Sequence, residues 1–201
     1  METALSICVG IGLSAACGFR VFVPLLVMSI ASLSGHMTLA HGFEWIGTYP
    51  ALVALAVATC LEIAGYYIPW LDHLLDTLAT PASIVAGTIV TASAVGDMSP
   101  FLKWTLAVIA GGGAAGLVQG ATILTRAAST ATTGGLANPL VSTLELGGAT
   151  VVSILAIVAP VLAVLLLVTI LAAISRKFFR KSRARSPGLD VPPAVSVTPT
   201  R

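Results

Sequence analysis

The chain has 201 residues, of which 57% are hydrophobic and 9% are charged. Soluble domains carry about 25% charged residues, so this composition excludes an ordinary soluble domain and indicates an integral membrane protein. Residues 1–175 hold three basic and seven acidic side chains, whereas residues 176–201 hold seven basic and one acidic. A basic run after an apolar segment is typical of the cytoplasmic side of a membrane span.

We therefore expect an all-α polytopic protein of the cell inner (plasma) membrane, with the lipid bilayer as its partner and no nucleic acid. Residues 1–175 are expected to form the transmembrane domain, and residues 176–201 a basic, largely disordered cytoplasmic tail. The start of the chain has neither a basic segment nor a small-residue cleavage site, so we expect its first apolar stretch to be retained.

A helix needs about 20 apolar residues to cross a bilayer, and the sequence predicts five such spans. The first is too long for one untilted crossing, and Arg20 interrupts it. It is either one long tilted helix or two half-helices that meet near Gly18, and Pro24 would bend it in either case. Five spans place the N-terminus outside, whereas a hairpin at Gly18 gives six spans and an inside N-terminus. The predicted spans are residues 4–33, 49–68, 80–96, 101–125 and 149–174.

The regions between the spans are less regular. Residues 70–79 are amphipathic and form either an interfacial helix or the entrance of the third span. The third span is rich in small residues, which indicates a place inside the bundle. Residues 126–145 are interpreted as a polar connection, in which a short helix starts at Asn138 and stops at Gly147–Gly148. Pro160 is expected to kink the last span.

Glycines on the fourth span are spaced by four residues, at Gly112, Gly116 and Gly120. Such a ladder lets another helix approach closely, within the chain or in a homo-oligomer. A similar small-residue pattern occurs 102 positions earlier, from Gly10 to Gly18. With three crossings between them, the copies would form an inverted-topology repeat, as in many transporters; the alternative is a chance match between alanine- and glycine-rich helices.

Arg20 and Glu62 are the charges most deeply placed in the predicted spans. A charge at the bilayer centre is costly and usually faces the protein interior or water. Arg20 is therefore either an anion or head-group contact, or a counter-ion in a proton path, or one half of a structural ion pair with Glu62. Glu62 is either a proton carrier or a hydrogen-bonded partner of Arg20 or of a neighbouring helix.

Asp72 and Asp76 share one helix face at a spacing of four residues. Paired carboxylates can hold a divalent cation or act as acid and base, but a solvated polar face is the simpler interpretation. The three cysteines and the loop histidines His36 and His41 lack metal-ligand spacing. We therefore expect no metal, no cofactor and no catalytic residue.

Three long motifs support a family resemblance: GLSAACGFRVFVP over residues 12–24, EIAGYYIPWLD over residues 62–72 and TTGGLANP over residues 132–139. Together these motifs resemble a family of small bacterial membrane proteins known as a domain of unknown function, over roughly residues 5–172. The resemblance implies a polytopic inner-membrane protein and supplies no reaction. The recurring residues that it implies include Arg20, Glu62, Asp72 and Asp76.

The sequence favours a transporter- or channel-like bundle for a small solute, an ion or a proton, which is not an enzyme. The alternative is a structural or lipid-interacting membrane protein whose charges only hold helices together. A third hypothesis is an intramembrane enzyme that acts on lipid head groups at Asp72 and Asp76. Transport requires that water reaches Arg20 or Glu62, whereas a scaffold requires no such access.

Overall fold

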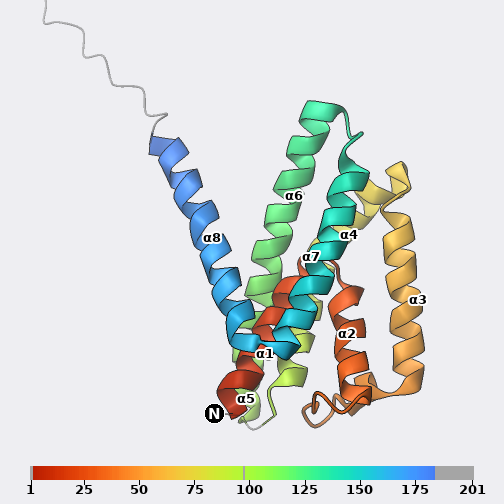
Figure 1. Cartoon of the computed structure of the whole chain (residues 1–201), viewed down its shortest axis with the longest axis vertical. Helices are drawn as coiled ribbons and strands as arrows, with labels where there is room; N and C mark the ends of the chain where they lie inside the picture. Colours follow the sequence, from red (N-terminus) through yellow and green to blue (C-terminus); the bar gives the residue numbers. More distant parts are fainter. Residues whose placement is uncertain (1, 97, 184–201) are drawn as a thin grey trace, which may run out of the picture. The chain divides into compact units, whose positions relative to one another are not determined.

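The computed structural model describes residues 2–96 and 98–183; the side chains of residues 2, 69–74, 76, 171 and 173–183 lie outside this description. All regular elements of the described part are helices (Figure 1). The chain divides into two compact units, Met1–Leu167 and Val168–Arg201, and helices α1 to α7 lie in the first. The helices are α1 Glu2–Cys17, α2 Phe22–Leu33, the 3₁₀ helix η1 Glu44–Gly47, α3 Tyr49–Gly65, α4 Pro69–Ala94, α5 Pro100–Leu106, the π-helical turn η2 Ala107–Gly112, α6 Gly113–Thr133, α7 Asn138–Val158 and α8 Pro160–Arg183.

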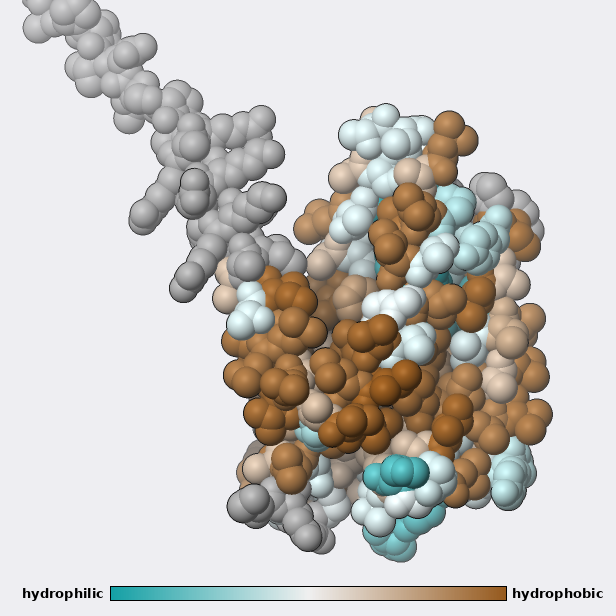
Figure 2. Space-filling view, in the orientation of Figure 1, coloured by the Kyte–Doolittle hydropathy of each residue, from teal (hydrophilic) through white to brown (hydrophobic). Residues whose placement is uncertain are grey.

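Three helical segments of the described chain are long and apolar enough to cross a membrane, namely Thr77–Ala94, Pro100–Thr133 and Asn138–Val158. Shorter apolar helices are Thr3–Cys17, Phe22–Leu33, Tyr49–Gly65 and Pro160–Ile170. Many large apolar side chains on these helices are exposed, and Figure 2 shows them as a broad hydrophobic surface. A water-soluble protein rarely exposes so large an apolar area. The chain is therefore an all-α membrane protein.

The first apolar run is two short helices, since α1 ends at Cys17 and α2 starts at Phe22. Pro24 does not bend a helix, contrary to expectation, because it lies in the first turn of α2, where proline is tolerated. Neither helix has the length of a full span, and Figure 1 shows the break about halfway along the bundle. The chain then returns to the end where it began, because Thr3 and Thr38 line the same pocket.

Helix α4 is continuous from Pro69 to Ala94, with Pro81 inside it. The amphipathic segment and the third span are therefore one helix. Its C-terminal half is central to the bundle: Val90, Thr91 and Ser93 are fully buried, and this half packs against α1 and η2. Small side chains allow these close contacts, as the composition of the segment indicated.

The π-helical turn η2 joins α5 and α6 into one helical segment, Pro100–Thr133. Its glycines lie against α4: a Cβ atom at Gly112 would lie 2.7 Å from Thr88 Oγ1, and one at Gly111 would collide with Thr91. Gly116 of α6 contacts Ile84 of α4, whereas a Cβ atom at Gly120 would meet no described atom within 4 Å. The close approach thus involves the first part of the glycine ladder and not its end.

The expected polar connection over residues 126–145 is wrong, because most of it is helical. Helix α6 continues to Thr133 and ends at Gly134, which has a left-handed φ of 64°. Helix α7 then starts at Asn138 and passes through Gly147–Gly148 to Val158. A buried face from Ser142 to Ser153 holds this helix in the bundle, so its packing outweighs the low helix propensity of the glycine pair. Pro160 does not kink a span, since it starts α8.

Helices α1 and α6 run parallel, so they are not the inverted pair that the repeated small-residue pattern suggested. Gly10 packs on Thr91, which also contacts Gly111 just before α6. Further along both helices, Gly18 packs on Ala115 and Gln119. The expectation of an inverted pair assumed that the chain crosses the membrane three times between the two copies. Because neither α1 nor α2 has the length of a full span, the number of crossings between the copies changes.

A buried charge cluster at the helix break

Four charged side chains from different parts of the sequence are buried around the α1–α2 break. The exposed fractions are 2% for Arg20, 8% for Glu62, 4% for Arg126 and 7% for Glu145. Arg20 lies in the link between α1 and α2, whereas the others lie on α3, α6 and α7. On insertion scales a single charge at the centre of a bilayer costs about 2.5–3.5 kcal/mol. Such a cluster therefore persists only if its members stabilise one another.

Glu62 stabilises the start of α2. Its Oε1 accepts a hydrogen bond from the Val21 N–H at 2.8 Å, and its Oε2 accepts one from the Phe22 N–H at 3.1 Å. The first N–H groups of a helix lack partners within the helix and carry partial positive charge. The Glu62 carboxylate satisfies two N–H groups at this point, and this explains how a helix can begin inside the bundle.

Arg126 and Glu145 form a buried ion pair between α6 and α7. Arg126 Nε donates to Glu145 Oε1 at 3.1 Å, and Arg126 Nη2 donates to Glu145 Oε2. Arg126 Nη2 also donates to the Ser142 hydroxyl at 3.0 Å. Both oxygens of Glu145 are thus occupied by one guanidinium, in the two-point geometry that makes arginine–carboxylate pairs strong.

Arg20 is less well satisfied than Arg126. Its Nη2 donates to the Ser142 carbonyl at 2.9 Å and lies 3.8 Å from Glu145 Oε2. The buried Nε and Nη1 atoms of Arg20 have no hydrogen-bond partner among the described residues. A buried donor without a partner costs about 1–3 kcal/mol, so Arg20 is incompletely stabilised by the described residues.

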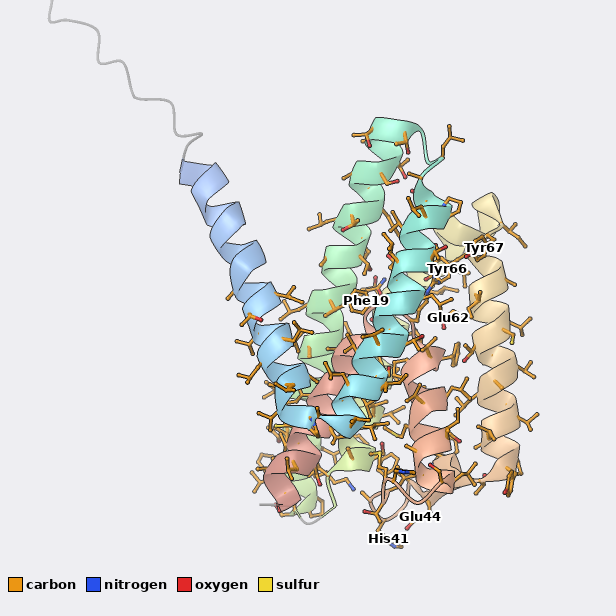
Figure 3. All side chains as sticks on the ribbon, viewed as in Figure 1. Phe19, His41, Glu44, Glu62, Tyr66 and Tyr67 are labelled. Carbon is orange, nitrogen blue, oxygen red and sulfur yellow. The ribbon has the colours of Figure 1, made fainter. Side chains whose placement is uncertain are left out.

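The Tyr66 ring packs against both guanidinium groups. Arg20 Cζ lies 3.8 Å and Arg126 Cζ lies 4.4 Å from the centre of this ring. Such cation–π contacts strengthen when water is excluded, and Tyr66 is 6% exposed. Tyr66 follows α3 directly, one helical turn after Glu62, and Figure 3 shows the two side chains near one end of α3.

The structure brings Arg20 and Glu62 to the same helix break, but the carboxylate within ion-pair distance of Arg20 belongs to Glu145. Asp72 and Asp76 lie in the first turns of α4, and their side chains fall outside the described residues. Sequence reasoning missed the other members of the cluster. A signal was present for Arg126, because Val118, Gln119, Thr122 and Arg126 recur on one buried face of α6.

A second polar region lies at the far end of the bundle, where Figure 3 shows His41 and Glu44. The pKa of the Glu44 carboxyl is lowered by a hydrogen bond from its own backbone N–H and by the contact with His41. A pocket of about 490 Å³ opens nearby, lined by Thr3, His41 and Gly96 among others. Within the described part of the chain, no three histidine, cysteine or acidic residues are grouped as metal ligands.

Comparison with known proteins places the chain in a family without a defined activity. No curated protein and no solved structure gave a significant match. The family model described as "Domain of unknown function (DUF4126)" matches residues 7–180. Since this match includes every member of the buried cluster and most of the sequence, the chain belongs to the DUF4126 family.

Proposed function

We propose that the protein transports a small solute or ion across the membrane and that the buried charge cluster at the α1–α2 break is its substrate site. The observation that carries this proposal is Arg20, a buried guanidinium with two nitrogens that have no partner among the described residues. A purely structural arginine is expected to use its donors fully, as charged groups buried in a membrane usually do.

The broken helix supports a transport role. Transporter sites commonly lie near the bilayer midplane, where discontinuous helices expose backbone groups to the substrate. Irregular backbone at membrane depth is tolerated only inside a protein or beside a water-filled cavity. The link between Cys17 and Phe22 has this character, and it carries Arg20.

Polar side chains between α1 and α4 suggest a route to the cluster. The pocket of about 490 Å³ is bounded by Ser6 of α1 and Ala94 of α4. Further along the same helices, the Ser14 hydroxyl donates to the Gly87 carbonyl at 2.6 Å and lies 2.8 Å from Thr91 Oγ1. In this conformation α1 and α4 pack directly on each other along these side chains, so passage of a solute between them requires the two helices to separate.

The alternative is a structural or lipid-interacting role, which the complete pairing of Glu145 by Arg126 favours. In that case the cluster joins the α1–α2 pair to α6 and α7 and needs no access to water. We expect no enzymatic activity in either case. We further propose a location in the plasma membrane with a cytoplasmic C-terminal tail, and self-association through exposed small residues such as Gly113 and Gly147.

Solvent access to the cluster distinguishes transport from scaffolding. Ser142→Cys would place a thiol inside the cluster, and Ser153→Cys provides a matched control on the same helix. Ser153 is also fully buried, but its hydroxyl donates only to the Ala149 carbonyl of α7. Both variants are made in a background of Cys8→Ser, Cys17→Ala and Cys60→Ser, and they are treated with membrane-impermeant thiol reagents in intact cells and in inverted vesicles.

Transport predicts that the Ser142→Cys thiol is modified from at least one side, whereas the Ser153→Cys thiol is not. If folded Ser142→Cys protein resists modification from both sides, water does not reach the cluster and the structural role is correct. Equal modification of both thiols would indicate a loosened bundle and would also contradict a defined pathway.

A further inference from the structure

We propose that the ligand of the charge cluster is a small, singly charged anion, such as a halide or a short carboxylate, and that Arg20 binds it. This inference rests on the proposed function, since it names the class of substrate for the same site. Four observations carry it: the Arg20 nitrogens that have no partner among the described residues, the hydrogen bonds that already occupy the carboxylates of Glu62 and Glu145, the position of the Tyr66 ring and the contrast with Arg126.

The open groups at the site are hydrogen-bond donors. Arg20 Nε and Nη1 are buried and have no partner among the described residues, whereas Nη2 donates to the Ser142 carbonyl. A guanidinium offers donors in a fixed plane and has no acceptor. A ligand that satisfies these nitrogens must therefore supply lone pairs, and a negative charge would strengthen each hydrogen bond.

Neither carboxylate of the cluster satisfies these donors. The oxygens of Glu62 accept from the Val21 and Phe22 N–H groups, and those of Glu145 accept from Arg126. The positive end of α2 adds to the charge of the two arginines. Glu145 Oε2 lies 3.8 Å from Arg20 Nη2, but among the described residues no carboxylate oxygen accepts from Nε or Nη1, and each carboxylate oxygen of Glu62 and Glu145 already accepts a hydrogen bond.

Tyr66 limits how a ligand can approach. Its ring covers one face of the Arg20 guanidinium at 3.8 Å, so the ligand must bind at the edge of the planar group. Arg20 is 2% exposed, and a ligand of few atoms fits such a position better than a lipid head group does. The site therefore favours ions of the size of chloride or formate.

Arg126 provides an internal comparison. It is as buried as Arg20 and contacts the same tyrosine ring, but it donates to both oxygens of Glu145 and to the Ser142 hydroxyl. Arg126 therefore acts as the structural arginine of the pair. Arg20 is the charged residue whose buried nitrogen donors have no hydrogen-bond partner among the described residues.

The test measures the modification rate of the Ser142→Cys thiol in the cysteine-free background. Two impermeant thiosulfonate reagents of similar size are compared, one with a negative sulfonate group and one with a positive trimethylammonium group. An anion site predicts a several-fold faster reaction with the negative reagent. Chloride or formate should slow this reaction several-fold relative to gluconate, a larger anion, at the same sodium concentration.

Arg20→Lys tests whether the arginine is responsible. Lysine keeps the positive charge but offers a compact ammonium in place of the planar donors, so protection by formate should be lost or strongly reduced. Persistence of full protection in this variant would overturn the assignment to Arg20. If the variant does not fold, the comparison of anions in the protein with native Arg20 still decides whether the site binds anions.

The outcomes separate this inference from the proposed function. If both reagents modify the thiol equally and no anion protects it, water reaches the cluster but the anion site is wrong. If neither reagent reacts, the proposed pathway is contradicted, and the unfolding temperatures described next decide whether the cluster binds an anion. In a separate measurement on purified protein, chloride and formate should raise the unfolding temperature above its value in gluconate, and equal temperatures in all three salts would contradict anion binding.

Discussion

At the scale of single residues, Glu62 has a clearer structural role than its place in an apolar helix suggests. Its two oxygens hold the Val21 and Phe22 N–H groups at the start of α2. Without the carboxylate, these donors would lie unpaired inside the bundle. Glu62 therefore fixes the position of the helix break, and with it the position of Arg20.

We expect Glu62→Ala to lower the free energy of unfolding by roughly 2 kcal/mol or more, because two buried donors lose a charged acceptor. Glu62→Gln should cost less, since its amide oxygen can still accept one hydrogen bond. Thr59→Val is the matched control on α3, because the Thr59 hydroxyl is buried without a partner among the described residues. Thermal unfolding in detergent micelles checks whether stability falls most in Glu62→Ala, less in Glu62→Gln and least in Thr59→Val. A Glu62→Ala variant as stable as Thr59→Val would contradict the prediction.

The residue scale also shows what the sequence could reveal about the site. Arg20 and Glu62 are conspicuous because each is a charge within an apolar run, and this signal needs no knowledge of packing. Arg126 and Glu145 were missed because they appeared to bound a polar connection. The structure places them on facing helices, and no local pattern states which distant side chains a fold will pair.

At the scale of helices, Gly18 sets how closely the end of α1 approaches α6. A Cβ atom at this position would lie 2.5 Å from the Ala115 carbonyl oxygen and 2.9 Å from the Gln119 backbone nitrogen. Backbone atoms inside a helix cannot move aside without shifting the helix. The approach of the two helices therefore requires glycine, and Arg20 follows it by two residues.

We expect Gly18→Ala to destabilise the protein by about 1–3 kcal/mol, the range found for overpacked cores. Gly120→Ala is the control, because no described atom lies within 4 Å of a Cβ atom there, and alanine favours a helix over glycine by up to about 1 kcal/mol. Unfolding temperatures in detergent should fall for the first variant and stay equal or rise for the second. A neutral Gly18→Ala would show that α1 can shift without cost.

Helix ends were the part of the fold that the sequence predicted least well. Apolar runs identify most helices because burial in lipid demands them. Proline and glycine misled the prediction: Pro24 lies in the first turn of a helix, Pro160 starts another, and Gly147–Gly148 lies inside a third. Such residues weaken a helix locally, but packing on neighbouring helices decides whether it ends there.

At the scale of the whole molecule, the short α1–α2 pair changes which parts of the chain share a side of the membrane. Thr3 and His41 line one pocket at the end where α4 finishes. The segment Pro100–Thr133 then leads to the opposite end, where Leu136 is exposed. The five-span scheme instead separated the N-terminus from the loop after the first span.

Thiols at Thr3→Cys and Ser99→Cys should therefore react from one side of the membrane, and a thiol at Leu136→Cys from the other. Impermeant reagents should accordingly modify the first two thiols in one preparation only, intact cells or inverted vesicles, and the third in the other preparation only, with Ser153→Cys as the buried control. Modification of Thr3→Cys and Ser99→Cys from opposite sides would contradict the short α1–α2 pair, since only a first segment that crosses the whole bilayer separates these two positions.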